Sequence, residues 1–154
     1  AAPPKDELEQ VKQELNEYRD KYLRTLAESD NMRKRLQKER QEMMTYAVSQ
    51  LVAEFLGPID HMENALKYTT QMSEEVKHWS LGFQMILTQF KDVLSDNGVQ
   101  PFNSLGETFD PHLHEAVETE SKEGSAPGKI IEEFVRGYKM GDKIIRPARV
   151  KVAK

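Results

Sequence analysis

Residues 6–56 read DELEQVKQELNEYRDKYLRTLAESDNMRKRLQKERQEMMTYAVSQLVAEFL, with no glycine or proline before Gly57-Pro58. Apolar residues recur there at alternating spacings of three and four, the a/d pattern of a coiled coil. Such a helix would extend roughly 75 Å, too far to bury its stripe against the remaining chain. We therefore expect a homodimer. Its predicted seam consists of Leu8, Val11, Leu15, Tyr18, Tyr22, Met32, Leu36 and Met43.

Polar residues interrupt this predicted seam. Thr25, Ser29 and Glu39 occupy core positions, where each lowers coiled-coil stability while fixing the register. We therefore expect a marginal coiled coil that frays on heating. The basic residues 33–35 lie in its middle; they form either a solvated helix face, with an Arg35 to Glu39 pair, or a partner site.

Composition narrows the class of protein. The 154 residues include 22 basic, 26 acidic and no cysteine residues. Disulfides, thiolate metal sites and a cysteine nucleophile are thereby excluded, and a reducing, cytoplasmic location is expected. No apolar run approaches the length of about 20 residues that a membrane span needs, and no signal peptide is visible.

The sequence predicts two further helices after the long one. Gly57-Pro58 should end the long helix, and residues 59–68 should form a short second helix. Ser73 should cap a third helix that closes at Asn97-Gly98. Its apolar stripe exposes too much surface for one chain, so two copies should form a four-helix bundle. The predicted bundle core is Val76, Trp79, Phe83, Ile86 and Phe90.

From Gly98 onward the pattern becomes that of strands. Period-two segments occupy residues 113–119, 130–135, 143–146 and 148–152, and Pro147 favours an edge or a bend. We expect a small antiparallel β-domain that depends on the bundle for stability. The predicted fold class is α+β, with a dimerising helix (1–56), a helix pair (57–97) and a β-domain (98–154).

Residues 109–115 (FDPHLHE) are the best candidate for chemistry. His112 and His114 would share a strand face and bind a metal with Asp110 or Glu115. A third ligand in position is missing, so a structural turn with partly buried histidines is favoured. The sequence has no glycine-rich phosphate loop or nucleophile elbow, so we expect neither an enzyme nor a cofactor.

Basic residues gather near Tyr138 in the carboxy-terminal block. Residues 129–154 contain eight basic and three acidic side chains, whereas the whole chain is acidic. Without a recognised nucleic-acid-reading motif, a protein partner is expected rather than DNA or RNA. The cluster comprises Lys139, Lys143, Arg146, Arg149 and Lys151.

Three separate segments of the sequence resemble the motifs of one known protein family. Residues 31–35 (NMRKR), 109–117 (FDPHLHEAV) and 137–152 (GYKMGDKIIRPARVKV) resemble, in this order, motifs of the GrpE family. The resemblance implies a parallel homodimer with paired helices, a four-helix bundle and two β-domains. It also implies a nucleotide exchange factor that binds the ATPase domain of a DnaK-type chaperone, holds the nucleotide cleft open and releases ADP. Adenine nucleotide would be affected only through the chaperone.

The resemblance also implies partner contacts at Arg33, Tyr46, Gly82, Pro111, Lys143 and Val152. Two have alternatives: Gly82 permits close helix packing, and Val152 belongs to a β-core. Glu42 departs from the family, which can carry a lysine there, so contacts near Glu42 are not carried over. A further hypothesis is that the long helix unwinds reversibly on heating and lowers exchange. The alternative function is a coiled-coil scaffold or client-holding chaperone without nucleotide coupling.

Overall fold

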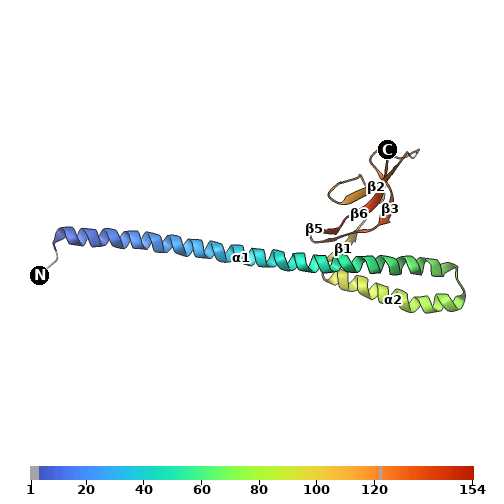
Figure 1. The fold of residues 1–154 in the computed structure, drawn as a ribbon, viewed down its shortest axis with the longest axis horizontal. Coiled ribbons are helices and arrows are strands. Elements are labelled where there is room, and N and C mark those ends of the chain that lie inside the picture. Colours follow the sequence, from blue (N-terminus) through green and yellow to red (C-terminus); the bar gives the residue numbers. More distant parts are fainter. Residues whose placement is uncertain (1–3, 122) are drawn as a thin grey trace. The chain divides into compact units, whose positions relative to one another are not determined.

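The computed structural model describes residues 4–121 and 123–154 (Figure 1). Helix α1 (Lys5–Tyr68), the 3-10 turn η1 (Thr69–Gln71) and helix α2 (Glu74–Asp96) precede the strands. The chain divides into two compact units, residues 1–46 and 47–154. The predicted α+β class is confirmed. The strands are β1 (Val99–Phe102), β2 (His114–Glu120), β3 (Ile130–Val135), β4 (Gly137–Met140), β5 (Lys143–Arg146) and β6 (Ala148–Ala153).

Helix α1 does not end at Gly57-Pro58, so the predicted helix end and separate second helix were wrong. Pro58 lies inside α1. A proline lacks the N–H that would bond the carbonyl of Glu54, and its ring crowds the Cβ of the preceding residue. Gly57 has no Cβ, and Leu56 and Ile59 are buried, at 0% and 5% exposure. Tertiary packing around the proline therefore maintains the helix.

Helix α2 confirms the predicted third helix. Ser73 occupies the N-cap position with extended backbone angles, but its side chain makes no capping hydrogen bond. At the other end, Gly98 has a φ of 79°, and its N–H donates to the Ser95 carbonyl at 2.9 Å. A positive φ favours glycine, which explains why the helix stops there.

The strands form two three-stranded sheets, in the orders β1-β4-β5 and β2-β6-β3. All pairs are antiparallel except β2 and β6, which run parallel, so the expectation of a purely antiparallel β-domain was wrong. A period-two pattern does not encode strand direction. Pro147 separates β5 from β6, which belong to different sheets; the predicted bend is confirmed.

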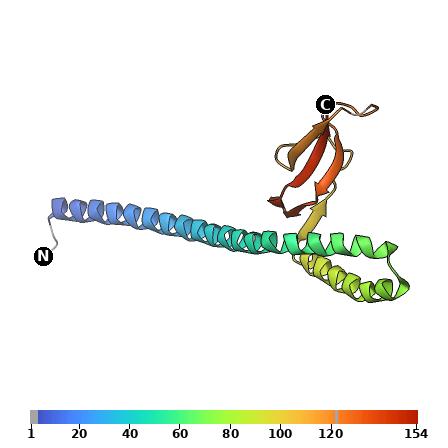
Figure 2. The ribbon, with the colours of Figure 1, turned by 45° about the vertical axis from the view of Figure 1, so that its right-hand side comes forward.

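Two buried clusters organise residues 47–154. The first lies on strands β3 and β6 of the second sheet and consists of Ile130, Ala148, Val150 and Val152. Leu56, Val99 and Tyr138 form the other, with Leu94 and Ile145 packed against it. Figure 2 shows β1 leaving the end of α2 and leading into the strands. The second cluster joins both helices to the first sheet, so the β-domain packs on the helices of its own chain.

Candidate functional site: exposed helix faces and the β-domain

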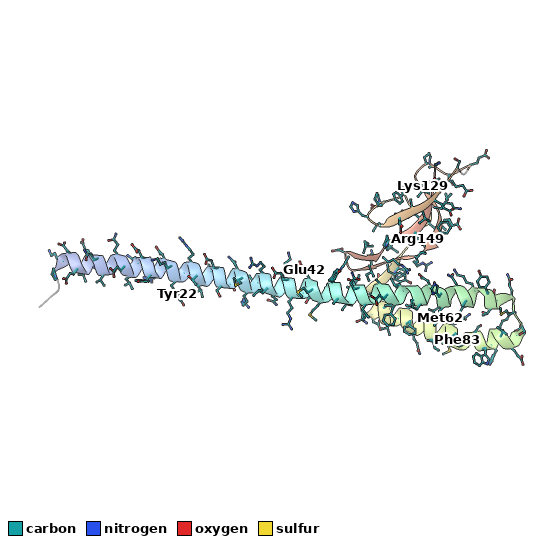
Figure 3. The ribbon with its side chains drawn as sticks, viewed as in Figure 1. Tyr22, Glu42, Met62, Phe83, Lys129 and Arg149 are labelled. Atoms are coloured by element: carbon teal, nitrogen blue, oxygen red, sulfur yellow. The ribbon has the colours of Figure 1, made fainter. Side chains whose placement is uncertain are left out.

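The predicted seam residues are exposed on α1 of the single chain. Their exposed fractions range from 46% at Leu8 to 72% at Met43. Figure 3 shows Tyr22 projecting from the helix. The polar seam positions Thr25, Ser29 and Glu39 are exposed as well. An exposed apolar stripe on a helix surface, even with a few polar interruptions, is typical of a protein interface.

A second apolar surface lies between the carboxy-terminal part of α1 and α2. It is a groove of about 450 Å³. Met62 of α1 and Phe83 of α2, both labelled in Figure 3, contribute to its walls. Trp79 stacks near Phe83 with ring centroids 5.9 Å apart and is 74% exposed. The predicted bundle-core residues thus lie on one open face and are between 38% and 74% exposed.

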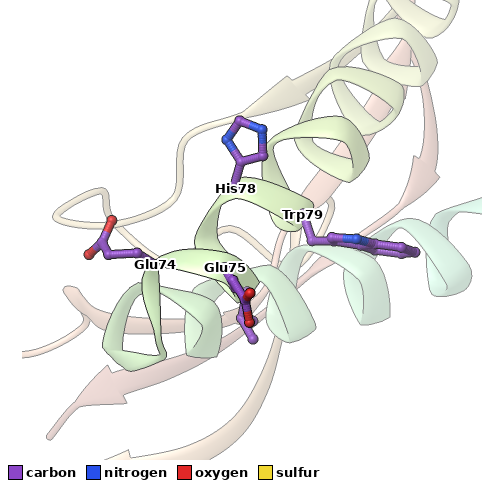
Figure 4. Close-up of a pocket in the computed structure, with 5 residues that line it drawn as sticks. Glu74, Glu75, His78 and Trp79 are labelled. Carbon is purple, nitrogen blue, oxygen red and sulfur yellow. The ribbon is translucent and has the colours of Figure 1, made fainter.

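The first turn of α2 borders a wider hollow of about 930 Å³, shown in Figure 4. Its lining includes Glu74, His78 and Trp79, whose side chains point in different directions. Glu74 accepts a hydrogen bond from Lys77 at 2.8 Å. The hollow therefore has no set of polar groups that converge on one ligand.

The residues around His114 form a tight turn before β2. His114 is 5% exposed, between the rings of Phe102 and Phe109. Its Nδ1 accepts the backbone N–H of Asp110 at 3.0 Å, and Asp110 Oδ1 accepts the N–H of His112 at 2.9 Å. This is the structural turn favoured by the sequence, and it presents Pro111 on the surface.

The metal alternative finds no support at this turn. The lone pair on His114 Nδ1 is engaged by the backbone, so that atom is not free to bind a metal. Across residues 4–121 and 123–154, no three His, Asp or Glu side chains gather in a metal-binding arrangement.

The carboxy-terminal basic residues are largely paired with carboxylates. Lys151 lies 3.2 Å from each of Glu118, Glu120 and Glu132. Hydrogen bonds to Glu132 and then to Glu118 and Glu120 raise the pKa of Lys151 above its ordinary value. Arg149 lies 3.8 Å from Glu115. The block therefore does not present the open basic surface that nucleic acid binding needs.

Arg33 lies in the first unit, and most of its side chain is exposed to solvent. Its side chain is 73% exposed and pairs with Asp30 at 3.0 Å. Lys34 also contacts Asp30, at 2.7 Å, and hydrogen bonds from Lys34 and Arg33 lower the pKa of that carboxyl. Glu42, the position that departs from the family, is paired with Lys38 at 3.8 Å. Tyr46, at the end of this unit, is 58% exposed.

Four predicted contact residues lie in the second unit: Gly82 on α2, Pro111 in the turn, Lys143 on β5 and Val152 on β6. Apart from its two chain neighbours and the backbone of its own helix, nothing lies within 4 Å of a Cβ placed on Gly82, so packing against other parts of the chain does not require glycine there. Lys143 is half-buried. Val152 is only 8% exposed, in the core of the second sheet, which is the alternative that the sequence left open.

Sequence reasoning missed an ion pair that joins α1 to β5. Arg146 Nη1 donates to Asp60 Oδ2 at 2.7 Å, and Nη2 donates to Oδ1 at 3.3 Å. The two residues are 86 positions apart, so no spacing rule connects them. The sequence signal is limited to Arg146 itself, which follows two isoleucines at the end of β5.

The chain is similar to known proteins of one family over nearly its whole length. The family model GrpE matches residues 2–154. Protein GrpE of Protochlamydia amoebophila (strain UWE25) is 62% identical over 149 residues, which are 97% of this chain and 71% of that protein. Protein GrpE of Chlamydia felis (strain Fe/C-56) is 57% identical over 148 residues, 96% of this chain and 79% of that protein. Protein GrpE of Chlamydia pneumoniae is 54% identical over 148 residues, 96% and 80% respectively.

Proposed function

Because this chain belongs to the GrpE family, we propose that it is the nucleotide exchange factor of a DnaK-type chaperone. The family match over residues 2–154 is the observation that carries the proposal. The protein is then a co-chaperone rather than an enzyme, since releasing ADP from a partner makes and breaks no covalent bond. We place this activity in the cytoplasm, where the lack of cysteine fits a reducing compartment.

The working form is a parallel homodimer. Two observations support it: the exposed seam on α1 and the open groove between α1 and α2. A second copy would cover both, pairing the long helices and completing a four-helix bundle. No helix in the described part of the chain is both long and apolar enough to cross a membrane.

Exchange requires that the protein bind the open nucleotide cleft of the chaperone more tightly than the closed one. A ligand shifts a conformational equilibrium only by its difference in affinity for the two states. We propose that the β-domain and the adjoining helix bind the ATPase domain in its open form. ADP then leaves the widened cleft and ATP enters.

The proposed contacts use exposed or half-buried residues in each unit: Arg33 and Tyr46 in the first, and Gly82, Pro111 and Lys143 in the second. For Val152 we propose a supporting role, because its side chain lies in the core. Basic contacts at Arg33 and Lys143 would meet acidic groups of the chaperone and steer association.

Stopped-flow release of a fluorescent ADP analogue from a DnaK-type chaperone tests the function. Adding this protein should accelerate release in a saturable manner. No acceleration would refute the proposal. If the protein instead suppressed client aggregation by itself, the client-holding alternative would replace it.

Lys143→Ala should weaken the acceleration of ADP release without destabilising the protein. We expect the concentration for half-maximal acceleration to rise about fivefold, the equivalent of a charge contact of about 1 kcal/mol, with an unchanged melting temperature. Lys139→Ala, on the neighbouring strand β4, is the matched control. Equal effects of both substitutions would indicate general loss of charge, and a lowered melting temperature for Lys143→Ala would make this residue structural.

A further inference from the structure

Arg146 brings three parts of the second unit together. Beyond its two hydrogen bonds to Asp60 of α1, its Nε and Nη2 donate to the carbonyl oxygen of Arg136 at 3.2 and 2.7 Å. Its guanidinium carbon lies 5.6 Å from the centre of the Tyr138 ring on β4. One planar side chain thus links α1, the residue between β3 and β4, and the first sheet.

This ion pair is more shielded than most others in the molecule. The side chains of Arg146 and Asp60 are 20% and 22% exposed, whereas those of Arg149 and Glu115 are 53% and 58% exposed. Exposed pairs contribute little, but a shielded bidentate pair has both strength and a defined geometry. Lysine would keep the charge at position 146 without the planar fork.

The apolar contacts beside this pair hold the β-domain against the helix without defining its angle. Leu56 packs with Val99 and Tyr138, and such burial is non-directional. Asp60 lies one helical turn beyond Leu56, and Arg146 lies on the same strand as Lys143. The ion pair therefore supplies the directional constraint between α1 and the strand that carries a proposed partner contact.

We propose that Asp60 and Arg146 form a positioning latch that holds the β-domain at a fixed angle on α1 and so converts chaperone binding into cleft opening. This inference rests on the proposed exchange function. A hinged β-domain would follow the chaperone lobe as it moves and would bind the open and closed clefts almost equally. A ligand with equal affinity for both states shifts nothing, however tightly it binds.

The kinetic test uses Asp60→Asn and Arg146→Lys, which preserve side-chain size. At saturating exchange factor, ADP release should be roughly five- to tenfold slower than with the wild type, within the range of coupling between sites. The half-saturating concentration should change less than twofold. Because both substitutions break the same latch, the double variant should lose no more than either single one.

Glu63→Gln is the matched control. It breaks an ion pair with Lys91 between α1 and α2, one turn from Asp60, and leaves the latch intact. This variant should release ADP at the wild-type saturating rate. An equal loss in Glu63→Gln, or wild-type saturating rates in both latch variants, would overturn the proposal.

A second readout needs no chaperone. The chain lacks cysteine, so spin labels attach only at two introduced cysteines, Lys67→Cys on α1 and Thr119→Cys on β2. Labelled protein is diluted into excess unlabelled protein so that only distances within one chain are measured. The distance distribution should be narrow with the latch and broad in Asp60→Asn. Equal widths would refute the latch even if exchange occurs, whereas a wild type that binds no chaperone would refute only the proposed function.

Discussion

Lys151 looks like a free surface charge in the sequence, but in the structure it is paired with three carboxylates. Strand register places Glu118 of β2 and Glu132 of β3 opposite Lys151 of β6. Lys151 and Arg149 of the basic carboxy-terminal block are therefore paired with carboxylates on neighbouring strands. Lys143 retains its place among the proposed contacts because it lies on β5, at the turn that joins β4 to β5.

Tyr138 should make stability depend on alkaline pH. Burial, followed by the charges of Glu63 and Asp60, raises the pKa of Tyr138. Its folded-state pKa exceeds the unfolded value of about 10, so this stability is present below that value and is lost as pH rises through the folded-state pKa. Tyr138→Phe removes the titration, and its melting temperature should fall less steeply above pH 10 or so.

The measurement is thermal unfolding across the alkaline range. Tyr68→Phe is the control, because Tyr68 is 73% exposed and should leave the pH dependence of the wild type unchanged. Parallel pH curves for the wild type and Tyr138→Phe would show that Tyr138 does not couple folding to pH.

Helix α2 contains a glycine that its own chain does not explain. A helical glycine destabilises by about 1 kcal/mol relative to alanine. Since no atom from another part of the chain lies near a Cβ at Gly82, close packing within one chain is not the reason for it. We therefore propose that the glycine serves a surface that approaches α2 from outside, either the second copy or the chaperone.

Gly82→Ala separates these two possibilities. We expect the free energy of unfolding to rise by about 0.5–1 kcal/mol, because alanine favours the helix, while half-saturation of ADP release moves to higher concentration. Gln84→Ala, on an exposed part of the same helix, controls for the added alanine. A lower melting temperature for Gly82→Ala would instead place the residue in the dimer interface.

The molecule as a whole has two apolar faces that belong to different units. The α1 seam lies in residues 1–46, and the groove beside α2 lies in residues 47–154. The seam has polar residues, Thr25 and Ser29 among them, at its predicted core positions, whereas the groove has six apolar lining residues beside Thr69 and Ser80. If dimerisation covers both faces, the paired helices should melt at a lower temperature than the bundle.

Calorimetry should therefore show two transitions. Thr25→Leu with Ser29→Leu should raise the lower one until it merges with the upper, because burying a leucine stabilises by about 1.5–3 kcal/mol. Gln37→Leu with Gln41→Leu, at outward positions of the next heptad along the helix, should leave the transitions separate. A single transition in the wild type would contradict the heat-sensing hypothesis.

The amino-acid sequence by itself determined the long helix with its exposed apolar stripe, helix α2, the four strands β2, β3, β5 and β6, and the three motifs of the family. These features follow from local periodicity, capping and turn residues, which act within a few positions of the chain. Only the tertiary structure decided the rest. Packing around Leu56 and Ile59 maintains α1 through Pro58. Strand β1 pairs with β4 although it contains Pro101, and the pairing requires Gly137, because a Cβ there would overlap the Phe102 ring.

The parallel direction of β2 and β6 and the contact of Asp60 with Arg146 belong to that second class. Both join residues that are distant in the chain. Their geometry depends on burial and hydrogen bonding across elements, and no local pattern encodes it.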